Sequence, residues 1–513
     1  MSFAKVQSAQ TYLLNTHIID VEVDLSRGLH AFSIVGLPDK AVEEAKDRVS
    51  SAIKNSGFSS PKSKNQKVVV SLAPADLKKE GPSFDLPIAL SYLLSAEEIS
   101  FDPRAKIFLG ELSLDGSLRP VTGVLPLVRE AVRKKFEEVY VPEENTEEAA
   151  LVSGITVYGV NNLSQLIAHL SKDPTEEKTQ KLKPTPQTKI KRKLSEQPFD
   201  FADIKGQEHG KRALEIAGAG GHNIALYGPA GTGKTMLARA FPYILPMLSE
   251  EEILEVTSIH SVSGILKGSY VTEPPFRSPH HTSSYVSLVG GGAIPKPGEI
   301  TLAHRGVLFL DEFPEFERRA IDALRQPLED RVISISRAKG VGVFPANFIL
   351  VAALNPCPCG NRGGVKECVC SARDIMRYDR KMAGPIADRI DLWVEVPLLR
   401  HEKLGDENYK GEQSKEVRGR VMRARKAEEK RFKKNKRGIK LNAEMGAKDI
   451  GIHIHLSDRL KNLLNTSAAR LALSPRSYHK VLKVSRTIAD LDQSKEVEER
   501  HLLEAFQYRP KSE

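Results

Sequence analysis

The stretch that most constrains this chain is GPAGTGKT at residues 228–235. It fits the pattern G-x-x-x-x-G-K-[ST], whose glycines turn backbone N–H groups toward phosphate oxygens at the start of a helix. Residues 223–227 before it are apolar, as in a buried strand, and residues 236–241 after it suit a helix. The pattern predicts a triphosphate-binding loop made by Gly228, Pro229, Ala230, Gly231, Thr232, Gly233, Lys234 and Thr235.

A second apolar strand, within residues 306–310, ends in an acid pair, Asp311 and Glu312. Such a pair downstream of a phosphate loop completes a site for nucleotide hydrolysis. We expect Lys234 to reach the β- and γ-phosphates of ATP, and Thr235 and Asp311 to hold Mg²⁺. Glu312 is then placed to polarise the attacking water.

The chain has 513 residues, enough for about two to four domains, and its content of 40% hydrophobic and 28% charged residues is typical of a soluble protein. No apolar run approaches the roughly 20 residues of a membrane span. The first residues do not resemble a signal peptide, so we expect a cytoplasmic location without membrane partners. A net charge of +10 favours a polyanionic partner, nucleic acid first, over a merely basic soluble protein.

Residues 1–170 mix short strands and helices, which predicts an α+β domain. Residues 72–87 and 108–145 resemble the proteolytic (S5-like) domain of Lon proteases, which uses a Ser–Lys dyad. Ser83 stands at the position of that serine, but Leu125 occupies the position of the lysine. The next basic residue, Arg129, cannot act as a neutral amine base. The resemblance therefore implies a Lon-like scaffold without protease activity.

Residues 171–198 lack apolar periodicity and are rich in Lys, Pro and Thr, which predicts an exposed linker. Residues 199–398 form the predicted ATPase core, and residues 399–513 a basic connector followed by a helical lid. In the connector, residues 415–440 carry thirteen Lys or Arg and three Glu, which suits either a solvated face or contact with DNA.

Inside the core, residues 257–301 form a long insertion that contains His280 and His281. Metal binding there lacks a third nearby ligand, so a flexible loop that contacts a polyanion is favoured. Residues 332–343 alternate apolar and polar positions around Ala-Lys-Gly, which predicts a hairpin with Arg337 and Lys339 near its tip. It resembles the basic hairpin that faces the pore in MCM helicases and magnesium chelatase motors, and we expect it to contact DNA.

Three polar residues match further AAA+ ATPase motifs. Asn355 ends the apolar strand 347–355, where the sensor 1 residue of these ATPases contacts the γ-phosphate or its water. Arg389 lies in the segment DRID, and the resemblance implies an arginine finger that completes a neighbour's site; a salt bridge to Asp388 or Asp391 is the alternative. Arg476, in SPRSYHK, stands where sensor 2 of an AAA+ lid reaches the phosphates.

All four cysteines fall in one pattern, C-x-C-x8-C-x-C, formed by Cys357, Cys359, Cys368 and Cys370. Disulfides are rare in cytosolic proteins, so four clustered thiolates indicate a structural Zn²⁺ site. Free or redox-active thiols remain the alternative, because C-x-C is tighter than the usual C-x2-C spacing.

Taken in order, these motifs resemble the YifB/ComM family of magnesium chelatase-like AAA+ proteins over nearly the whole chain. The resemblance implies an α/β P-loop core with a helical lid, and an ATP-dependent homo-hexameric motor on branched or single-stranded DNA. It further implies helicase activity that promotes branch migration during recombination in natural transformation. The alternative is a magnesium chelatase-type motor with a client other than DNA.

Overall fold

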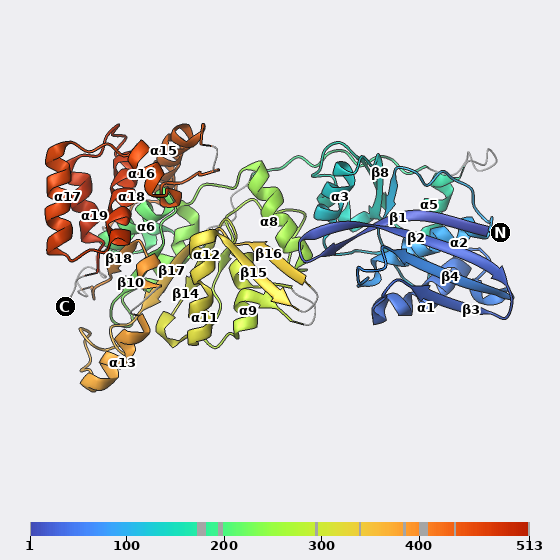
Figure 1. The fold of residues 1–513 in the computed structure, drawn as a ribbon, viewed down its shortest axis with the longest axis horizontal. Coiled ribbons are helices and arrows are strands. Elements are labelled where there is room, and N and C mark those ends of the chain that lie inside the picture. Colours follow the sequence, from blue (N-terminus) through green and yellow to red (C-terminus); the bar gives the residue numbers. More distant parts are fainter. Residues whose placement is uncertain are drawn as a thin grey trace. The chain divides into compact units, whose positions relative to one another are not determined.

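The computed structural model describes residues 2–171, 181–192, 198–292, 296–337, 340–382, 386–399, 409–435 and 438–510. They form two compact units, shown in Figure 1. Unit 1 comprises Met1–Lys191 and Glu250–Val271, and unit 2 comprises Arg192–Ser249 and Thr272–Glu513.

Unit 1 contains a four-stranded sheet in the order β1-β2-β4-β3. β1 (Ser2–Tyr12) and β4 (Gln66–Ala73) pair antiparallel with β2 (Asn15–Arg27), and β3 (Ala31–Val35) pairs parallel with β4. Alternate residues of β2 and β4 are fully buried, so one face of the sheet forms the core. α2 (Asp85–Ser95) packs on that face, and α1 (Lys40–Asn55) packs on α2.

Unit 1 also contains a parallel sheet in the order β5-β8-β9 and a two-stranded antiparallel sheet, β6-β7. The mixture of one mixed sheet, one parallel sheet and flanking helices agrees with the predicted α+β class. The remaining elements are β5 (Lys106–Phe108), β6 (Glu111–Leu112), β7 (Leu118–Arg119), α3 (Val124–Arg133), β8 (Glu138–Pro142), α4 (Thr146–Ala149), β9 (Thr156–Val160) and α5 (Leu163–Leu170).

The helix α8 (Glu250–Val262) belongs to unit 1 although the phosphate loop separates it from the rest of that unit in sequence. It packs against α3. The Ser261 hydroxyl accepts a hydrogen bond from the Gly123 amide (2.9 Å) and donates one to Glu148 Oε1 (2.5 Å). The apolar side of α8 is buried and is formed by Ile253, Val256 and Ile259. The predicted insertion thus begins inside a helix that is a structural part of unit 1.

Part of the predicted linker lies along unit 1. Thr185 N–H donates to the Val157 carbonyl (2.8 Å) and Thr188 N–H donates to the Ala150 carbonyl (3.0 Å). An extended segment gains backbone partners by lying beside the edge strand β9, and most side chains of residues 181–192 are exposed. Residues 172–180 and 193–197 of that linker lie outside the described residues.

Unit 2 is built on a five-stranded parallel sheet in the order β11-β14-β17-β10-β18 (Figure 1). Every residue of β14 and β17 is buried, as expected for a parallel sheet covered on both faces. This architecture confirms the predicted α/β core. The strands are β10 (Ile224–Tyr227), β11 (Phe276–Arg277), β14 (Val307–Leu310), β17 (Ile349–Leu354) and β18 (Leu392–Glu395).

The core helices and a hairpin surround this sheet. β15 (Val332–Arg337) and β16 (Gly340–Pro345) pair antiparallel, which is the hairpin predicted for residues 332–343. The other elements are α6 (Glu208–Gly220), α7 (Lys234–Ala240), α9 (Tyr285–Val289), β12 (Gly290–Gly291), β13 (Lys296–Pro297), α10 (Glu299–Leu302), α11 (Arg318–Ala323), α12 (Arg325–Asp330) and α13 (Ala372–Met382).

The C-terminal helices gather beside α6 in Figure 1. α15 packs on α6 and on α18, and α18 packs on α19. No helix in the described part of the chain is long and apolar enough to cross a membrane. These helices are α15 (Ser414–Phe432), α16 (Ala447–His453), α17 (Asp458–Arg470), α18 (Pro475–Leu491) and α19 (Glu499–Gln507).

Several arginines of the basic run support the lid rather than a solvated face. Arg425 donates to the Gly218 carbonyl of α6 (2.7 Å), and Arg420 pairs with the buried Glu215. Arg431 donates to Asp490 Oδ2 (2.8 Å). The inward side of α15 thus fastens the lid to the core.

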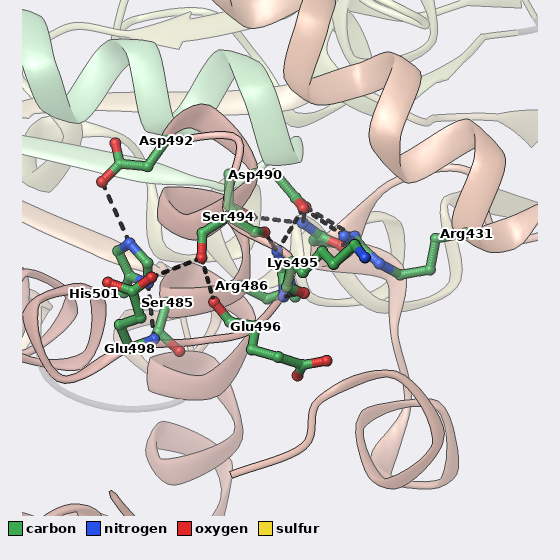
Figure 2. A network of polar contacts seen from close by, with 12 residues as sticks. Arg431, Ser485, Arg486, Asp490, Asp492, Ser494, Lys495, Glu496, Glu498 and His501 are labelled. Atoms are coloured by element: carbon green, nitrogen blue, oxygen red, sulfur yellow. Dashed lines mark hydrogen bonds and ion pairs between the residues drawn. The ribbon is translucent and has the colours of Figure 1, made fainter. Parts of the chain in front are cut away.

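Figure 2 shows the network at the end of α18. Asp490 also accepts from Arg486 Nη2 (2.9 Å), and the same guanidinium donates to the backbone carbonyls of Ser494 (2.6 Å) and Lys495 (2.8 Å). Arg486 is only 2% exposed. It closes the turn after α18 and is therefore a structural residue of the lid.

Candidate nucleotide-binding site

Three neighbouring strands deliver the predicted ATP site. The phosphate loop follows β10, Asn355 follows β17, and Asp311 follows β14. These strands are adjacent and parallel, in the order β14-β17-β10, so their carboxyl ends meet at one edge of the sheet. The fold therefore brings together side chains that are far apart in sequence.

Lys234 lies in the hollow of the loop. Its Nζ donates to the carbonyls of Gly228 (2.6 Å) and Pro229 (2.8 Å) and to Asn355 Oδ1 (3.1 Å). The side chain is buried, and this burial lowers the pKa of its ammonium. A phosphate that entered the loop would supply the negative charge that these neutral oxygens lack.

The loop needs glycine at two positions for different reasons. A Cβ on Gly228 would lie 2.2 Å from the carbonyl oxygen of Val396, so the backbone directly after β18 leaves no room for a side chain. Gly233 has φ +93° at the start of α7, a conformation that favours glycine. Gln207, which we did not predict to touch the loop, donates to the carbonyls of Thr232 (3.0 Å) and Pro397 (2.8 Å).

The hydroxyl of Thr235 donates to Asp311 Oδ2 (2.9 Å). A hydroxyl and a carboxylate at the mouth of a phosphate loop are the hard oxygen groups that Mg²⁺ prefers. The pair therefore fits the predicted magnesium site.

Glu312, the predicted base, has an unpredicted partner. Its Oε2 lies 3.1 Å from Nδ1 of His281, which comes from the insertion after β11. The ring of His281 lies 4.2 Å from that of His280. Glu312 itself has φ +51°, which is uncommon for a residue with a side chain.

Arg389 and Arg476 meet at one carboxylate. Arg389 Nη2 lies 2.8 Å from Glu329 Oε2, and Arg476 pairs with Oε1 of the same residue. Burial lowers the pKa of Arg389, and the nearby Arg325 lowers it further. Asp391, a possible partner of Arg389 by sequence, pairs with Lys480 (3.2 Å).

Both arginines line a cleft of about 450 Å³ whose lining carries both basic and acidic side chains. None of residues 228–235 is among the described residues that line it. The structure thus brings Arg389 and Arg476 together on a surface that is separate from their own phosphate loop. Its basic lining residues are Arg331, Arg389, Arg476, Lys480 and Lys483, and its acidic ones are Glu329, Asp330, Asp388, Asp391 and Glu444.

Comparison with known proteins decides the family. A model described as magnesium chelatase, subunit ChlI matches residues 200–404; models of subunit ChlI of Mg-chelatase and of the ChlI C-terminal region match residues 21–145 and 411–509. The chain is 42% identical over 511 residues to competence protein ComM of Haemophilus influenzae, covering 99% of this chain and 98% of that protein. It is 43% identical over 511 residues to YifB of Escherichia coli K12, covering 99% and 97%. The chain belongs to the ComM/YifB family of magnesium chelatase-like AAA+ proteins.

Part of this ComM/YifB chain is also similar to a Lon protease. Lon protease 2 of Bacillus subtilis is 30% identical over 151 residues, 28% of this chain and 27% of that protein. Ser83 lies in the 3₁₀ turn Pro82–Phe84 before α2. Leu125 is fully buried in α3, and its amide donates to Glu148 Oε1 (2.8 Å). The position predicted for the Lon lysine therefore holds a core residue of the helix that packs against α8.

The four cysteines of this ComM/YifB chain lie together, with all sulfur atoms within 4.8 Å of one another. The Sγ–Sγ distances from Cys357 are 3.5 Å to Cys359 and 3.6 Å to Cys368. Four sulfurs at about 2.3 Å from a tetrahedral Zn²⁺ would be about 3.8 Å apart, so the cluster fits this ion. Backbone amides of Cys359 and Arg362 donate to sulfurs of Cys370 and Cys357 at 3.4 Å.

The pKa of Cys359 is lowered to about 6, and the main cause is the hydrogen bond from the backbone amide of Asn361. The amide of Cys359 lowers the pKa of Cys370, but burial and the neighbouring sulfurs outweigh it and raise that pKa to about 12. The adjacent thiols therefore resist ionising together. A bound cation would favour their ionised forms.

The cysteine cluster touches the phosphate loop. The amide of Ala230 donates to the Gly360 carbonyl (3.2 Å), and Gly360 lies between two cysteines of the cluster. A Cβ on Gly360 would lie 3.5 Å from Cβ of Ala230 and 3.6 Å from Asn355 Nδ2. The cluster thus supports both the loop and the residue that contacts Lys234.

The two predicted DNA-contacting residues, Arg337 and Lys339, stand in the sequence where β15 gives way to β16. Arg337 is the last residue of β15 and pairs with Gly340 across the hairpin. Lys339 lies outside the described residues.

Proposed function

We propose that this chain is an ATP-driven motor that assembles into a homo-hexameric ring and acts on DNA. The observation that carries the proposal is the convergence of Lys234, Asn355, Thr235 and Asp311 at one edge of the sheet. Such an arrangement serves phosphoryl transfer, in which positioning and charge stabilisation do most of the work.

In this proposal Lys234 exchanges its neutral acceptors for the β- and γ-phosphate oxygens of ATP. Thr235 and Asp311 would hold Mg²⁺, which neutralises phosphate charge when bound. Glu312 accepts a proton from the attacking water, and Asn355, already on Lys234, is placed to orient the γ-phosphate.

Arg389 and Arg476 would complete the site of a neighbouring subunit. The described lining of their shared cleft contains no residue of their own phosphate loop, and the two guanidinium groups suit the phosphates bound by a second copy. A ring lets each subunit offer this face to the next one.

DNA is the favoured client for three reasons. The net charge is +10, the hairpin β15–β16 carries Arg337 and Lys339, and a relative over the full length is named a competence protein. We therefore propose helicase activity that promotes branch migration during natural transformation, in the cytoplasm. The cysteine cluster would hold a structural Zn²⁺.

The family models give a second candidate, a chelatase-type motor with a client other than DNA. The first experiment separates the two by measuring the ATPase rate with Mg²⁺ and linear, forked or four-way DNA. Stronger stimulation by branched than by linear duplex supports the DNA motor. A rate that no DNA changes would favour the chelatase-type motor.

The hairpin provides a sharper version of this test. The double variant Arg337→Ala with Lys339→Ala should hydrolyse ATP at the wild-type basal rate, assemble normally by light scattering, and lose stimulation by DNA. Arg318→Ala is the matched control because Arg318 is 92% exposed in the same unit. Full stimulation of the double variant would remove the hairpin from the mechanism.

A further inference from the structure

The lid helix α15 sorts its basic residues onto two opposite sides. On the inward side, Arg418 is 8% exposed and donates to the Tyr243 carbonyl (3.4 Å), and Arg425 donates to the Gly218 carbonyl (2.7 Å). A second set of basic residues is exposed to solvent: Lys415, Arg423, Lys426, Lys430 and Lys433. One side of α15 therefore fastens the lid, and the other side presents positive charge.

The exposed set lies on one face of the helix. Successive residues of an α-helix are about 100° apart, so positions 415, 423, 426, 430 and 433 fall within a sector of about 80° that is about 27 Å long. Lys433 directly follows α15 and keeps helical backbone angles, with φ −49° and ψ −32°. Gly419 falls in the same sector and has no side chain to interrupt it. We call these five basic residues the outer face of α15.

The positive charge of the outer face is not neutralised within the part of the chain that the structure describes. No ion pair or hydrogen bond joins any of its five side chains to a described residue. The acidic residues of α15 lie elsewhere, because Glu428 is buried and Glu416 and Glu429 flank the sector. Five like charges on one face repel one another, and a polyanion would relieve this repulsion.

The chemistry of the outer face fits a nucleic-acid backbone better than a protein or a membrane. The aromatic residue of α15, Phe432, is buried, and the large apolar side chain that α15 exposes is Met422 (43%). Protein partners need apolar anchors at the centre of the interface, and membranes take up the apolar face of a helix. The apolar face of α15 already packs on α6 and α18. Unpaired bases stack on aromatic rings, so the phosphates of duplex DNA are favoured.

We propose that the outer face of α15 is a second DNA-contacting surface, which holds the backbone of duplex DNA independently of sequence. Its length of about 27 Å matches about eight phosphates of one strand, which follow one another every 3.4 Å or so along the axis. Contacts to phosphates position a duplex without reading its bases. This inference rests on the proposed DNA function and extends it: the outer face sets how tightly duplex DNA is held, whereas the hairpin β15–β16 couples DNA to hydrolysis.

The test is the full chain with Lys426→Gln, Lys430→Gln and Lys433→Gln, measured by fluorescence anisotropy of a labelled blunt duplex over a series of NaCl concentrations. Contacts with phosphates release counterions, so the logarithm of the association constant falls with the logarithm of the salt concentration, by about 0.9 per contact. Losing three contacts should make this slope less negative by about 2 to 3, and should weaken binding at about 0.1 M NaCl at least tenfold or so. An unchanged slope would overturn the proposal.

The matched control removes the same net charge from exposed positions of unit 2 outside α15, with Lys448→Gln, Lys461→Gln and Lys495→Gln. Its slope and its affinity for the duplex should stay close to those of the wild type. An equal loss in this control would show that net charge alone governs binding, and would contradict a site on α15.

A charge-conserving variant checks that the positive charges carry the effect. Lys426→Arg with Lys430→Arg and Lys433→Arg should keep the wild-type slope, because arginine also binds phosphate. All three triple variants should melt at the wild-type temperature, since the changed side chains are exposed. Loss of duplex binding in the arginine variant, at an unchanged melting temperature, would contradict the electrostatic contact.

Further readouts separate this surface from the hairpin, from a membrane and from the DNA function itself. The glutamine variant of α15 should need more DNA for half-maximal ATPase stimulation, whereas the hairpin variant loses the maximum. Cosedimentation with phosphatidylserine vesicles that the glutamine variant loses, with duplex binding intact, would assign the face to lipid and overturn the proposal. If the wild type binds no duplex, the DNA function fails as well. If wild type and glutamine variant bind duplex with the same slope, the α15 surface fails and the DNA function stands.

Discussion

Lys234 shows how one residue is prepared for a phosphate. Three neutral oxygens hold its ammonium, and burial lowers its pKa. A buried cation with only neutral acceptors gains most from an anionic ligand. The loop therefore favours an anionic phosphate ligand, and ATP provides such phosphates.

Glu312 should be needed for hydrolysis and not for binding. Glu312→Gln removes the proton acceptor but keeps the size of the side chain, so the variant should bind ATP while hydrolysis falls by about 10²- to 10⁴-fold. Fluorescent-nucleotide titration and a phosphate-release assay measure the two properties. Glu315→Gln is the control, since Glu315 follows closely and pairs with Lys381 (3.5 Å). Equal rates in the two variants would exclude Glu312 as the base.

Asp391 should stabilise unit 2. It is 8% exposed and lies 3.2 Å from Lys480 and 3.6 Å from His222. Asp391→Asn leaves Lys480 buried without its counter-charge, which should cost about 3–5 kcal/mol of unfolding free energy in urea denaturation. The exposed Asp388→Asn in the same motif should cost far less. Similar losses in both variants would contradict the buried pair.

The same pair predicts a dependence on pH. Burial alone would raise the pKa of Asp391, but Lys480 and then His222 hold it well below its usual range. The unfolded carboxyl titrates near 3.9, so the ionised form stabilises the fold above about pH 4, and this stability is lost as the pH falls further. The stability difference between wild type and Asp391→Asn should therefore be constant from about pH 5 to 7 and shrink below about pH 4.

At the scale of elements, the cysteine cluster holds the phosphate loop in place. Cys359→Ser should lower the zinc content measured by mass spectrometry and weaken ATP binding, because Gly360 next to it holds the amide of Ala230. Val365→Ser, at an 85% exposed position between the cysteine pairs, is the control. Unchanged ATP affinity after loss of the metal would show that the cluster does not support the loop.

The elements also show what a sequence can predict. The phosphate loop, the strand before Asp311 and the hairpin were predictable because their patterns lie within short stretches, and the parallel sheet then brings Asn355 to Lys234. The partners His281 of Glu312 and Glu329 of Arg389 were not predicted. They depend on how separate elements pack, and no local spacing encodes that. The side chain of Arg337 and all of Lys339 lie outside the described residues, so their contact with DNA stays a prediction.

At the scale of the whole molecule, a shared site should be recoverable by mixing subunits. Arg389→Ala and Lys234→Ala should each abolish hydrolysis. In mixed rings, some junctions combine an intact Lys234 with an intact Arg389 from the neighbour. An equal mixture should regain about a quarter of the wild-type ATPase rate if subunits assort at random.

The control mixture combines Lys234→Ala with Glu312→Gln. Both changes affect the same phosphate-loop site, so no junction regains a complete set and the rate should stay at background. Failure of the first mixture to exceed this control would show that Arg389 acts within its own subunit or not at all.

The place of α8 bears on how such a protein can be inherited. The polypeptide changes unit at residues 191/192, 249/250 and 271/272. A gene cut at the first point would give an N-terminal product without Ser261, leaving Glu148 buried without that hydroxyl, and a C-terminal product with the apolar side of α8 uncovered. Recombination between genes therefore cannot exchange the Lon-like unit by a single junction.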